Sequence, residues 1–424
     1  MKILLVNPPS KFLIDDNVFP TLGLLYLSAY LKRKDYNDVT LLDLNGNHVI
    51  PEAIEADVVG FYSNTPQFPY VVKLKEVLAR INMRRSAIYV IGGPHVSGRP
   101  EDALPHFDYV ISGEGERAFL DLVDSASGKT DMPKGQIIKY QYIEDINTIP
   151  FPDRALVDIK SYKYLIEGVP ATTLVTSRGC PFGCAFCANN AWGKTLRLRD
   201  PENVTEEMQI LIEQYGFKAF MFFDDTMTVS KKRMEILCNR IKKLDIIYRC
   251  FIRADTVDRE ILTKMKESGC VEVGMGMESG SQRILDTINK GQSVRQNLNI
   301  AKLCKQVGIS IKGFFVVGLP GEDRNSVHET IKFIEESKVD DLDITVFAPY
   351  PGSRIYEYKH KYDISFETTY ESSWYKGKPG FYRSAVSTSG LNSEEIVKIR
   401  NKMEKRFKKE QGARETGDFA KLVT

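Results

Sequence analysis

The chain has 424 residues, which suffices for two or three domains that each bury a core of their own. Hydrophobic residues make up 42% of it, and the net charge of +2 gives no general bias toward nucleic acid. No apolar run approaches the length that spans a bilayer, and Ile3–Val6 is too short for the core of a signal peptide.

Short apolar runs alternate with segments of helical spacing over residues 1–140. Strands are predicted at Lys2–Val6, Val39–Leu44, Val58–Tyr62, Ala87–Ile91 and Tyr109–Ile111, and helices at Leu22–Lys34, Val71–Ile81 and about Arg117–Asp124. This alternation predicts an α/β domain with a doubly wound, Rossmann-like parallel sheet.

Four loops would share one edge of that sheet, because each follows a strand. They are Asn7–Ser10, Ser63–Gln67, Gly92–His95 and Gly113–Glu116. Two of them carry glycines where a side chain would block a close approach of the backbone. Ligands of doubly wound sheets bind at the carboxyl ends of the strands, so we expect a ligand site here.

Residues 141–168 are expected to link two domains. The run Ile146–Arg154 contains Pro150 and Pro152, which can continue neither a helix nor a central strand.

Six strand–helix repeats follow in residues 169–355. Strands are predicted at Thr172–Thr176, Ala219–Phe223, Tyr248–Ile252, Val271–Met277, Ser310–Val317 and Leu342–Phe347, and helices at Thr205–Gln214, Arg233–Leu244, Glu260–Lys266, Asn297–Gln306 and Val327–Ser337. The pattern predicts a partial, open (β/α)6 barrel of the TIM type. Polar motifs follow the strands, at the ends where such barrels place their chemistry.

Three cysteines, Cys180, Cys184 and Cys187, lie in a loop directly after the first of these strands. Three soft thiolate ligands suit an iron–sulfur cluster better than a closed zinc site, which wants four ligands. The alternatives are structural cysteines or part of a zinc knuckle, but no fourth cysteine or histidine lies close by, since the next cysteine is Cys238.

This loop resembles the signature of the radical S-adenosylmethionine (radical SAM) enzymes, including the aromatic Phe186 before the last cysteine. The resemblance implies a 4Fe–4S cluster on three cysteines, with SAM on the fourth iron, and cleavage of SAM to a 5′-deoxyadenosyl radical. It also implies a set of SAM-contacting residues: Phe186, Asp224, Asp225, Arg253, Glu278, Ser279 and Gly318. Three alternatives stay open: Asp224 and Asp225 could cap a helix, Arg253 could form a structural ion pair with Asp255 or another carboxylate, and Glu278 could be a structural residue.

The N-terminal region is similar to the cobalamin-binding domain that precedes many radical SAM domains. The residues that the resemblance implies for cobalamin are Asn7, Pro8, Pro9, Asn45, Asn64, Thr65, Gly92, Gly93, Pro94, His95, Gly113, Glu114, Gly115 and Glu116. One departure concerns the Asp-x-His-x-x-Gly motif of proteins that bind cobalt through histidine. Here Asp43 is followed by Asn45 in the ligand position, and His48 is out of register. We therefore expect cobalamin without a histidine ligand, and a backbone-bonded loop role for His95. The alternative is a domain that has kept the fold and lost cobalamin.

The C-terminal segment, residues 356–424, has an aromatic-rich part and a charged helix. Trp374, Tyr375, Phe381 and Tyr382 could contact substrate or simply pack. A helix is predicted at Ser393–Phe407. The isolated cysteines Cys238, Cys250, Cys270 and Cys304 are expected in the core.

Together the two resemblances imply a cobalamin-dependent radical SAM enzyme, and within that group a methyltransferase acting on an unactivated carbon or on phosphorus. The first alternative is a radical rearrangement, cyclisation or ring contraction without net methyl transfer. The second is a cobalamin or redox sensor without turnover. The expected partners are a small-molecule or peptide substrate and an electron donor such as flavodoxin or ferredoxin, with neither nucleic acid nor membrane. The seven cysteines show no disulfide pattern, which fits a reducing cytoplasm.

Overall fold

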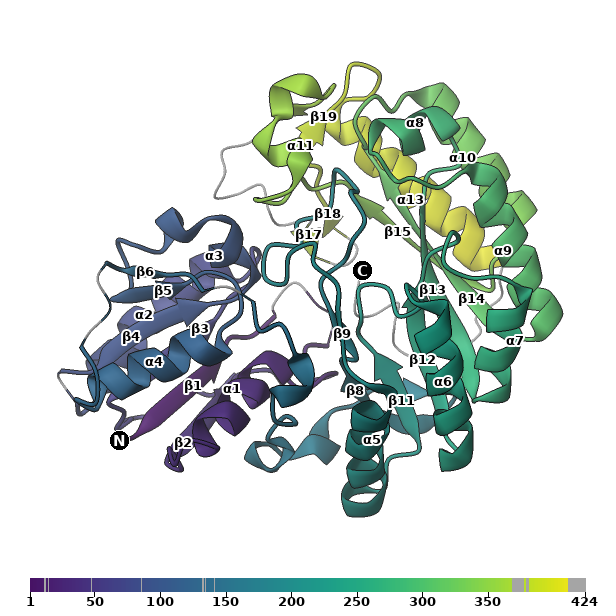
Figure 1. Ribbon diagram of the computed structural model, residues 1–424. Helices are drawn as coiled ribbons and strands as arrows, with labels where there is room; N and C mark the ends of the chain where they lie inside the picture. Colours follow the sequence, from purple (N-terminus) through teal and green to yellow (C-terminus); the bar gives the residue numbers. More distant parts are fainter. Residues whose placement is uncertain are drawn as a thin grey trace. The chain divides into compact units, whose positions relative to one another are not determined.

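The structure is a computed structural model that describes residues 1–410, except residues 11, 12, 14, 47, 85, 132, 134, 141, 368–376 and 379–380. Trp374 and Tyr375 therefore lie outside the described residues. The chain divides into two compact units (Figure 1). The first includes residues 1–10, 15–162 and 188–197, and the second includes residues 163–187 and 198–410. Within the described ranges, every helix is too short or too polar to cross a bilayer.

The first unit is built on one parallel sheet with the strand order β2-β1-β3-β4-β5-β6. Its strands are β1 (Ile3–Asn7), β2 (Val39–Asp43), β3 (Val58–Tyr62), β4 (Ile88–Gly92), β5 (Tyr109–Ile111) and β6 (Ile137–Ile138). Its helices are α1 (Leu22–Lys32), α2 (Phe68–Ile81), α3 (Pro94–Gly98) and α4 (Glu116–Ala126), with short 3-10 turns at Pro100–Asp102, Ile146–Thr148, Arg154–Leu156 and Ile159–Ser161. The predicted doubly wound sheet is confirmed; β6 and α3 were not predicted.

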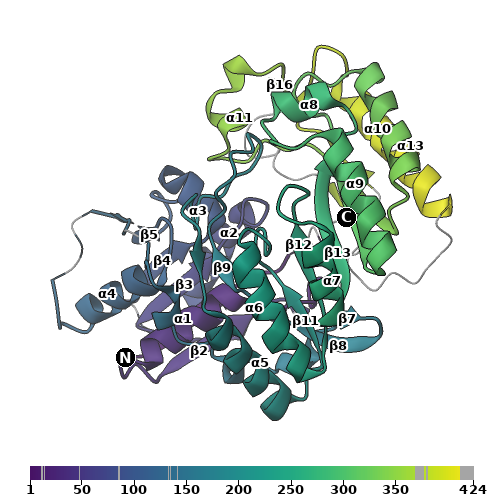
Figure 2. The ribbon, with the colours of Figure 1, turned by 45° about the vertical axis from the view of Figure 1, so that its right-hand side comes forward.

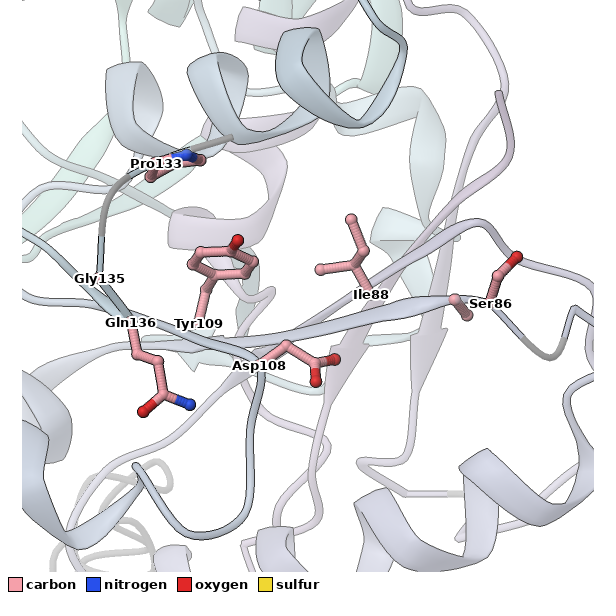
Figure 3. A pocket seen from close by; sticks show the side chains of 8 residues that line it. Ser86, Ile88, Asp108, Tyr109, Pro133, Gly135 and Gln136 are labelled. Atoms are coloured by element: carbon pink, nitrogen blue, oxygen red, sulfur yellow. The ribbon is translucent and has the colours of Figure 1, made fainter. Parts of the chain in front are cut away.

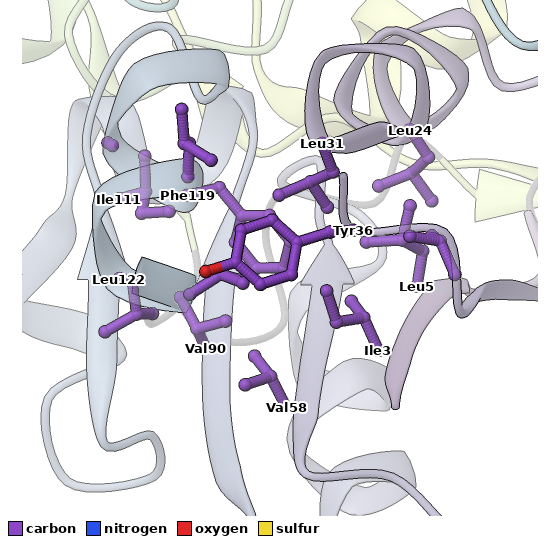
Figure 4. Packing of buried hydrophobic residues seen from close by; sticks show 14 of the residues in the cluster. Ile3, Leu5, Leu24, Leu31, Tyr36, Val58, Val90, Ile111, Phe119 and Leu122 are labelled. Carbon is purple, nitrogen blue, oxygen red and sulfur yellow. The ribbon is translucent and has the colours of Figure 1, made fainter. Parts of the chain in front are cut away.

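Side chains alternate across this sheet, so both of its faces are packed. Ile3 and Leu5 of β1 pack in one cluster with Leu24 of α1, as Figure 4 shows. Leu4 and Val6 point the other way, into a second cluster. A strand buried on both faces reads as a continuous apolar run, which is why β1 was visible in the sequence.

The second unit contains a curved sheet with the order β15-β14-β13-β12-β11-β8-β7, parallel except for β7. Its strands are β7 (Leu165–Ile166), β8 (Val169–Leu174), β11 (Ala219–Phe222), β12 (Ile247–Ile252), β13 (Cys270–Glu278), β14 (Ser310–Val317) and β15 (Asp341–Val346). The helices that follow these strands lie along the outside of the sheet in Figures 1 and 2. They are α5 (Pro201–Tyr215), α6 (Lys231–Ile241), α7 (Arg259–Glu267), α9 (Val294–Val307) and α10 (Arg324–Ser337). The predicted partial barrel is confirmed.

Smaller elements complete the unit and its connections. They are β9 (Ser177–Arg178), β10 (Arg197–Leu198), β16 (Ser365–Phe366), β17 (Gly377–Lys378), β18 (Phe381–Tyr382), β19 (Val386–Ser387), α8 (Gln282–Thr287), α11 (Arg354–Glu357), α13 (Ser393–Glu410) and 3-10 turns at Lys242–Leu244 and Lys359–Lys361. The cysteines expected in the core, Cys238, Cys250, Cys270 and Cys304, are all buried.

The C-terminal helix α13 lies along β15, the last strand of the curved sheet (Figure 1). Arg400 of α13 is 2% exposed and donates from Nε to the carbonyl oxygen of Ile344 at 2.7 Å. Its guanidinium also stacks 3.6 Å from the centre of the Tyr382 ring. Backbone groups at a sheet edge otherwise stay unpaired, so the helix protects this edge.

A buried group of charges crosses the face of the sheet that the outer helices leave uncovered. Lys312 of β14 is 1% exposed, and its Nζ lies 3.0 Å from carboxylate oxygens of both Asp341 and Asp343 on β15. Arg249 of β12 pairs with Glu272 of β13 at 3.3 Å. These residues occupy the amino-terminal half of the strands. In barrels this end contributes to stability, whereas the carboxyl end carries the chemistry.

Candidate functional site

The cysteine loop begins just after β9, with Gly179 in a left-handed conformation (φ 84°) directly before Cys180. The backbone N–H of Cys187 donates to the carbonyl of Cys184 at 3.3 Å, which makes the second half of the loop a tight turn. Ala185 holds the turn in place, because its carbonyl accepts from the N–H of Ile355 at 3.0 Å. All three thiols are free of disulfides.

Arg253, at the carboxyl end of β12, connects this loop to the barrel. Its Nη1 donates to Sγ of Cys184 at 3.4 Å, and its guanidinium stacks 3.6 Å from the centre of the Phe182 ring. Two further bonds join Arg253 to the carboxylate of Asp255, at 2.9 and 3.0 Å. The ion pair considered from the sequence is therefore present, and it aims the guanidinium at a cysteine.

The chemistry of these groups fits an iron–sulfur cluster. Burial raises the pKa of the Cys180 thiol, and the nearby Asp225 carboxylate raises it further, so a metal must displace a proton there. Among the described residues, no three His, Cys, Asp or Glu side chains converge on a single metal ion. A cubane needs no such convergence, since each thiolate binds a different iron.

The two aspartates after β11 have different surroundings. Asp224 is fully buried, and its carboxylate accepts from the N–H and hydroxyl of Thr176 and from the N–H of Ser177, at 2.5–2.8 Å. Burial raises its pKa in spite of these bonds. Asp224 is thus an anchor for the strand that leads into the cysteine loop and does not fit the predicted ligand role. Asp225 is exposed.

Glu278 ends β13 in a left-handed backbone conformation, with φ 61°. The register with β14 shifts at this point, between Gly276 and Glu278. Strain of this kind in a residue other than glycine is often found at functional sites. The carboxylate is buried and accepts from Nζ of Lys290 at 2.7 Å. Lys290 was not predicted; no residue pattern in the sequence connects it to Glu278.

Two other residues predicted to contact SAM form hydrogen bonds within the protein. Ser279 is fully buried, its hydroxyl lies 3.1 Å from the hydroxyl of Thr330, and it accepts from the N–H of Ser281. It does not fit the predicted contact. Gly318 has φ 91°, and its N–H donates to Glu322 at 2.5 Å. Burial raises the pKa of Glu322 to about 8.

The residues predicted for cobalamin all lie at the carboxyl edge of the first unit's sheet, on the last residues of β1 and β4, on the loops after strands or on helix starts. At the end of β2, Asp43 accepts from Asn7, from the N–H of Asn45 and from the Tyr162 hydroxyl, the last at 2.5 Å. Asp43 of the incomplete motif thus holds neighbouring parts of this edge, and Asn45 occupies the place of the missing histidine.

The loops after β1 and β3 are joined at the point where the strand order reverses. Gln67 donates from Nε2 to the Pro8 carbonyl at 3.1 Å and to the Ser10 hydroxyl at 3.0 Å. Asn64 caps the same turn, because its Oδ1 accepts from the N–H of Gln67 at 3.0 Å. Ligands of doubly wound sheets bind at this reversal.

Gly93 brings the loop after β4 close to the loop after β3. Its φ is 113°, and a Cβ there would lie 2.6 Å from the carbonyl oxygen of Ser63. The glycine expected at this edge is therefore required by the close approach of two backbones. Such a bare edge fits a large cofactor that contacts main chain.

His95 lies behind this loop, 1% exposed. Its Nδ1 is 3.3 Å from the Thr65 hydroxyl, its Nε2 is 3.4 Å from Asp102, and its ring stacks on Phe68 with centres 4.2 Å apart. Burial lowers its pKa to about 4. These polar contacts of its ring are to side chains, and the bonding to backbone expected from the sequence stays a prediction.

Glu114, also predicted for cobalamin, has an internal partner. Its carboxylate pairs with Arg197 at 2.7 Å, both side chains being about 5–6% exposed, and accepts from the N–H of Ile143 at 3.0 Å. Arg197 also stacks 4.7 Å from the centre of the Tyr142 ring. This pair fixes residues 188–197 within the first unit.

A pocket of about 540 Å³ lies at the other edge of the same sheet (Figure 3). It is lined by Ser86, Ala87, Ile88, Asp108, Tyr109, Pro133, Gly135 and Gln136, next to the amino ends of β4, β5 and β6. Asp108 accepts there from the N–H of Tyr89 at 2.7 Å. The pocket is therefore separate from the loops predicted to bind cobalamin.

Cob(II)alamin bound to this protein should give an electron paramagnetic resonance spectrum without splitting from a histidine nitrogen. Asn45 stands in the ligand position, and His95 is held between Thr65 and Asp102. The spectra of His95→Ala and His48→Ala should match that of the wild type. A nitrogen-split signal that vanished in either variant would show that histidine binds cobalt.

Two family models match the chain. The radical SAM superfamily model matches residues 174–334, and the B12 binding domain model matches residues 16–123. The regions agree with the cysteine loop and with the parallel sheet of the first unit.

Named relatives point the same way. An uncharacterized methyltransferase of Pyrococcus horikoshii is 35% identical over 386 residues, covering 84% of this chain and 83% of the relative. The anaerobic magnesium-protoporphyrin IX monomethyl ester cyclase of Rubrivivax gelatinosus is 26% identical, covering 80% of this chain and 66% of the cyclase. Among solved structures, the radical SAM methyltransferase TsrM of Kitasatospora setae, with tryptophan and a SAM analogue bound, gives a TM-score of 0.71 at 16% identity, covering 95% of this chain and 88% of TsrM. At that identity the likeness shows the fold.

Proposed function

Because this chain belongs to the radical SAM enzymes that carry a B12-binding domain, we propose that it methylates an unactivated carbon of a small molecule, using a 4Fe–4S cluster, SAM and cobalamin. One observation carries the proposal: the three-thiol loop with the Arg253 guanidinium donating to Cys184. A cation at a thiolate suits a cluster whose net charge is negative. A phosphorus atom of the substrate is the second candidate for the atom that is methylated.

The residue roles are proposed as follows. Cys180, Cys184 and Cys187 hold the cluster, and Asp225, the exposed carboxylate beside the thiols, meets the amino group of SAM. Glu278 holds the ribose hydroxyls. Asp224 and Ser279 move from the SAM site to the scaffold, because the protein already occupies their polar groups. Phe186 keeps its proposed place beside SAM, and Gly318 is kept only as a backbone contact, because its N–H donates to Glu322.

The loops at the carboxyl edge of the first unit are proposed to hold cobalamin. Gly93 adds no side chain to this edge and allows two loops to approach closely, and the reversal between β1 and β3 supplies the position. When bound, the cofactors supply a 5′-deoxyadenosyl radical and a methyl group, chemistry that no side chain offers. The protein's part is to bind and orient them and to keep water and oxygen out.

Aromatic rings on the uncovered face of the barrel suggest a flat, apolar substrate. Phe251 lies 6.2 Å from Phe223 and 5.9 Å from Phe314, centre to centre, and all three rings are partly exposed. Gly274 lies between two of them; a Cβ there would be 2.8 Å from each ring. Aromatic faces bind flat conjugated rings well. The names of two relatives mention such rings, a porphyrin for the cyclase and tryptophan for TsrM.

Cyclisation without methyl transfer remains the second candidate, because the cyclase relative covers most of this chain. We further propose a flavodoxin or ferredoxin as electron donor and the cytoplasm as compartment, since a cluster of this kind needs a reducing environment.

Product analysis separates these possibilities. Reconstituted anaerobic protein with cobalamin, SAM and dithionite should form 5′-deoxyadenosine and methionine from one SAM, and S-adenosylhomocysteine from a second SAM that donates the methyl group. Deoxyadenosine without S-adenosylhomocysteine would favour rearrangement or cyclisation. If neither product formed above the level of a Cys184→Ala control, the proposed enzyme activity would be wrong and a sensor would be favoured.

A further inference from the structure

A three-residue turn after α8, Ile288–Lys290, contacts the cysteine loop twice. The carbonyl of Ile288 accepts from the N–H of Ala185 at 2.8 Å. Asn289 donates from Nδ2 to the carbonyl of Gly183 at 2.7 Å. Gly183 and Ala185 both lie between the first and last cysteines of the loop. This turn therefore fixes the backbone that orients the thiols.

The same turn also holds two charged residues that the sequence predicts to contact SAM, Arg253 and Glu278. The carbonyl of Lys290 accepts from Nη2 of Arg253 at 2.9 Å, and Nζ of Lys290 donates to Oε1 of Glu278 at 2.7 Å. The side chains of Lys290 and Glu278 are 7% and 9% exposed. A charge pair so deeply buried depends on its geometry, because either charge alone would be costly.

Local backbone features show how closely this arrangement is specified. Asn289 and Glu278 both have positive φ angles, 50° and 61°. Gly276 leaves room for the pair, since a Cβ there would lie 2.9 Å from Nζ of Lys290 and even closer to Glu278. The ammonium group also lies 5.7 Å from the centre of the Phe186 ring, next to Cys187.

We propose that the turn Ile288–Lys290 couples SAM binding to retention of the iron–sulfur cluster, with Lys290 as a positioning residue for Glu278. Lys290 holds the Glu278 carboxylate in the orientation proposed for binding the ribose. Asn289 passes any shift of Lys290 to the cysteine loop through the Gly183 carbonyl. The inference rests on the proposed function and adds a physical link between two of its binding sites; coupling of this kind acts in both directions.

The alternative is that the turn only contributes packing. Packing alone would lower the melting temperature of turn variants without changing the effect of one site on the other. Two substitutions can separate these cases. Asn289→Gly keeps the left-handed backbone and removes only the side-chain donor. Lys290→Met removes the charge and keeps most of the volume.

The test measures SAM affinity and iron release to a chelator, without reductant, together with the melting temperature. Lys290→Met should weaken SAM binding about ten-fold or more, since truncating one partner of a buried pair is costly, and Lys290→Arg should recover much of it. Asn289→Gly should release iron several-fold faster and, in samples that still carry the full cluster, should also weaken SAM binding, although Asn289 touches no side chain proposed to bind SAM. The effects in the double variant should not add, as in linked sites.

Lys302→Met is the matched control, because Lys302 is an exposed lysine of α9 paired with Glu336 at 3.5 Å. It should match the wild type in all three measurements. If Asn289→Gly lowered only the melting temperature and left SAM affinity and iron release unchanged, the coupling would be refuted. A wild-type protein that assembled the cluster and bound SAM yet formed no deoxyadenosine would instead refute the proposed function, and the coupling would still be measurable.

Discussion

Replacing Cys184 with alanine should remove the cluster, lowering iron after anaerobic reconstitution from about four atoms per chain to nearly none. Each thiolate holds a different iron, so two cannot keep the cubane in place. Cys184 also accepts from Arg253, so its loss leaves that guanidinium without the thiolate that it faces. Cys180→Ala and Cys187→Ala should behave alike. Iron and sulfide analysis with the visible absorption spectrum measures the effect.

Cys304→Ala is the control for this set, because Cys304 is a fully buried thiol of α9 outside the loop. It should keep its iron and the broad cubane absorbance. Full iron in all three loop variants would exclude the loop as the cluster site. Loss of iron in Cys304→Ala together with unchanged melting behaviour would show that a residue outside the loop is needed.

Replacing Lys312 with methionine should cause the largest loss of stability. Lys312 lies 3.0 Å from Asp341 and Asp343, at 1% exposure, so the variant leaves two carboxylates in the barrel without their cation. Breaking a buried ion pair on one side costs roughly 3–5 kcal/mol. For a unit of this size that lowers the melting temperature by roughly 10 °C. Thermal unfolding of cofactor-free protein measures it.

Lys302→Met provides the comparison, since an exposed lysine contributes at most about 0.5 kcal/mol. Its melting temperature should stay within about 2 °C of the wild type. A second comparison removes charge on both sides: Lys312→Met combined with Asp343→Leu should be more stable than Lys312→Met alone. An unchanged melting temperature in Lys312→Met would mean that the pair contributes nothing to folding.

The fold was predictable because its strands are buried on both faces or alternate with helices of clear spacing. The run Ile3–Asn7 is buried throughout, and such runs are visible without any tertiary information. The helix predicted at Ser393–Phe407 is confirmed as α13 for the same reason. Short elements such as α3 and β6 were missed, because too few residues carry a periodic pattern.

The candidate site was only partly predictable. The cysteine spacing marked its loop, but adjacent Asp224 and Asp225 look alike in sequence and differ entirely in burial. The difference comes from hydrogen bonds that only Asp224 is described as making, to Thr176, which lies 48 positions away in the sequence. Lys290 was not predicted for the same reason: only the folded chain brings it next to its partner Glu278.

The pairing of Glu114 with Arg197 has a consequence for the order of events during synthesis. The first unit needs residues 188–197, which the ribosome makes only after all three cysteines. Until then Glu114 lacks its cation, so the nascent N-terminal unit is incomplete. The first unit can therefore reach its complete set of contacts only after the cysteine loop has been synthesised. Chain growth itself thus places the three cysteines outside the ribosome before the first unit is complete.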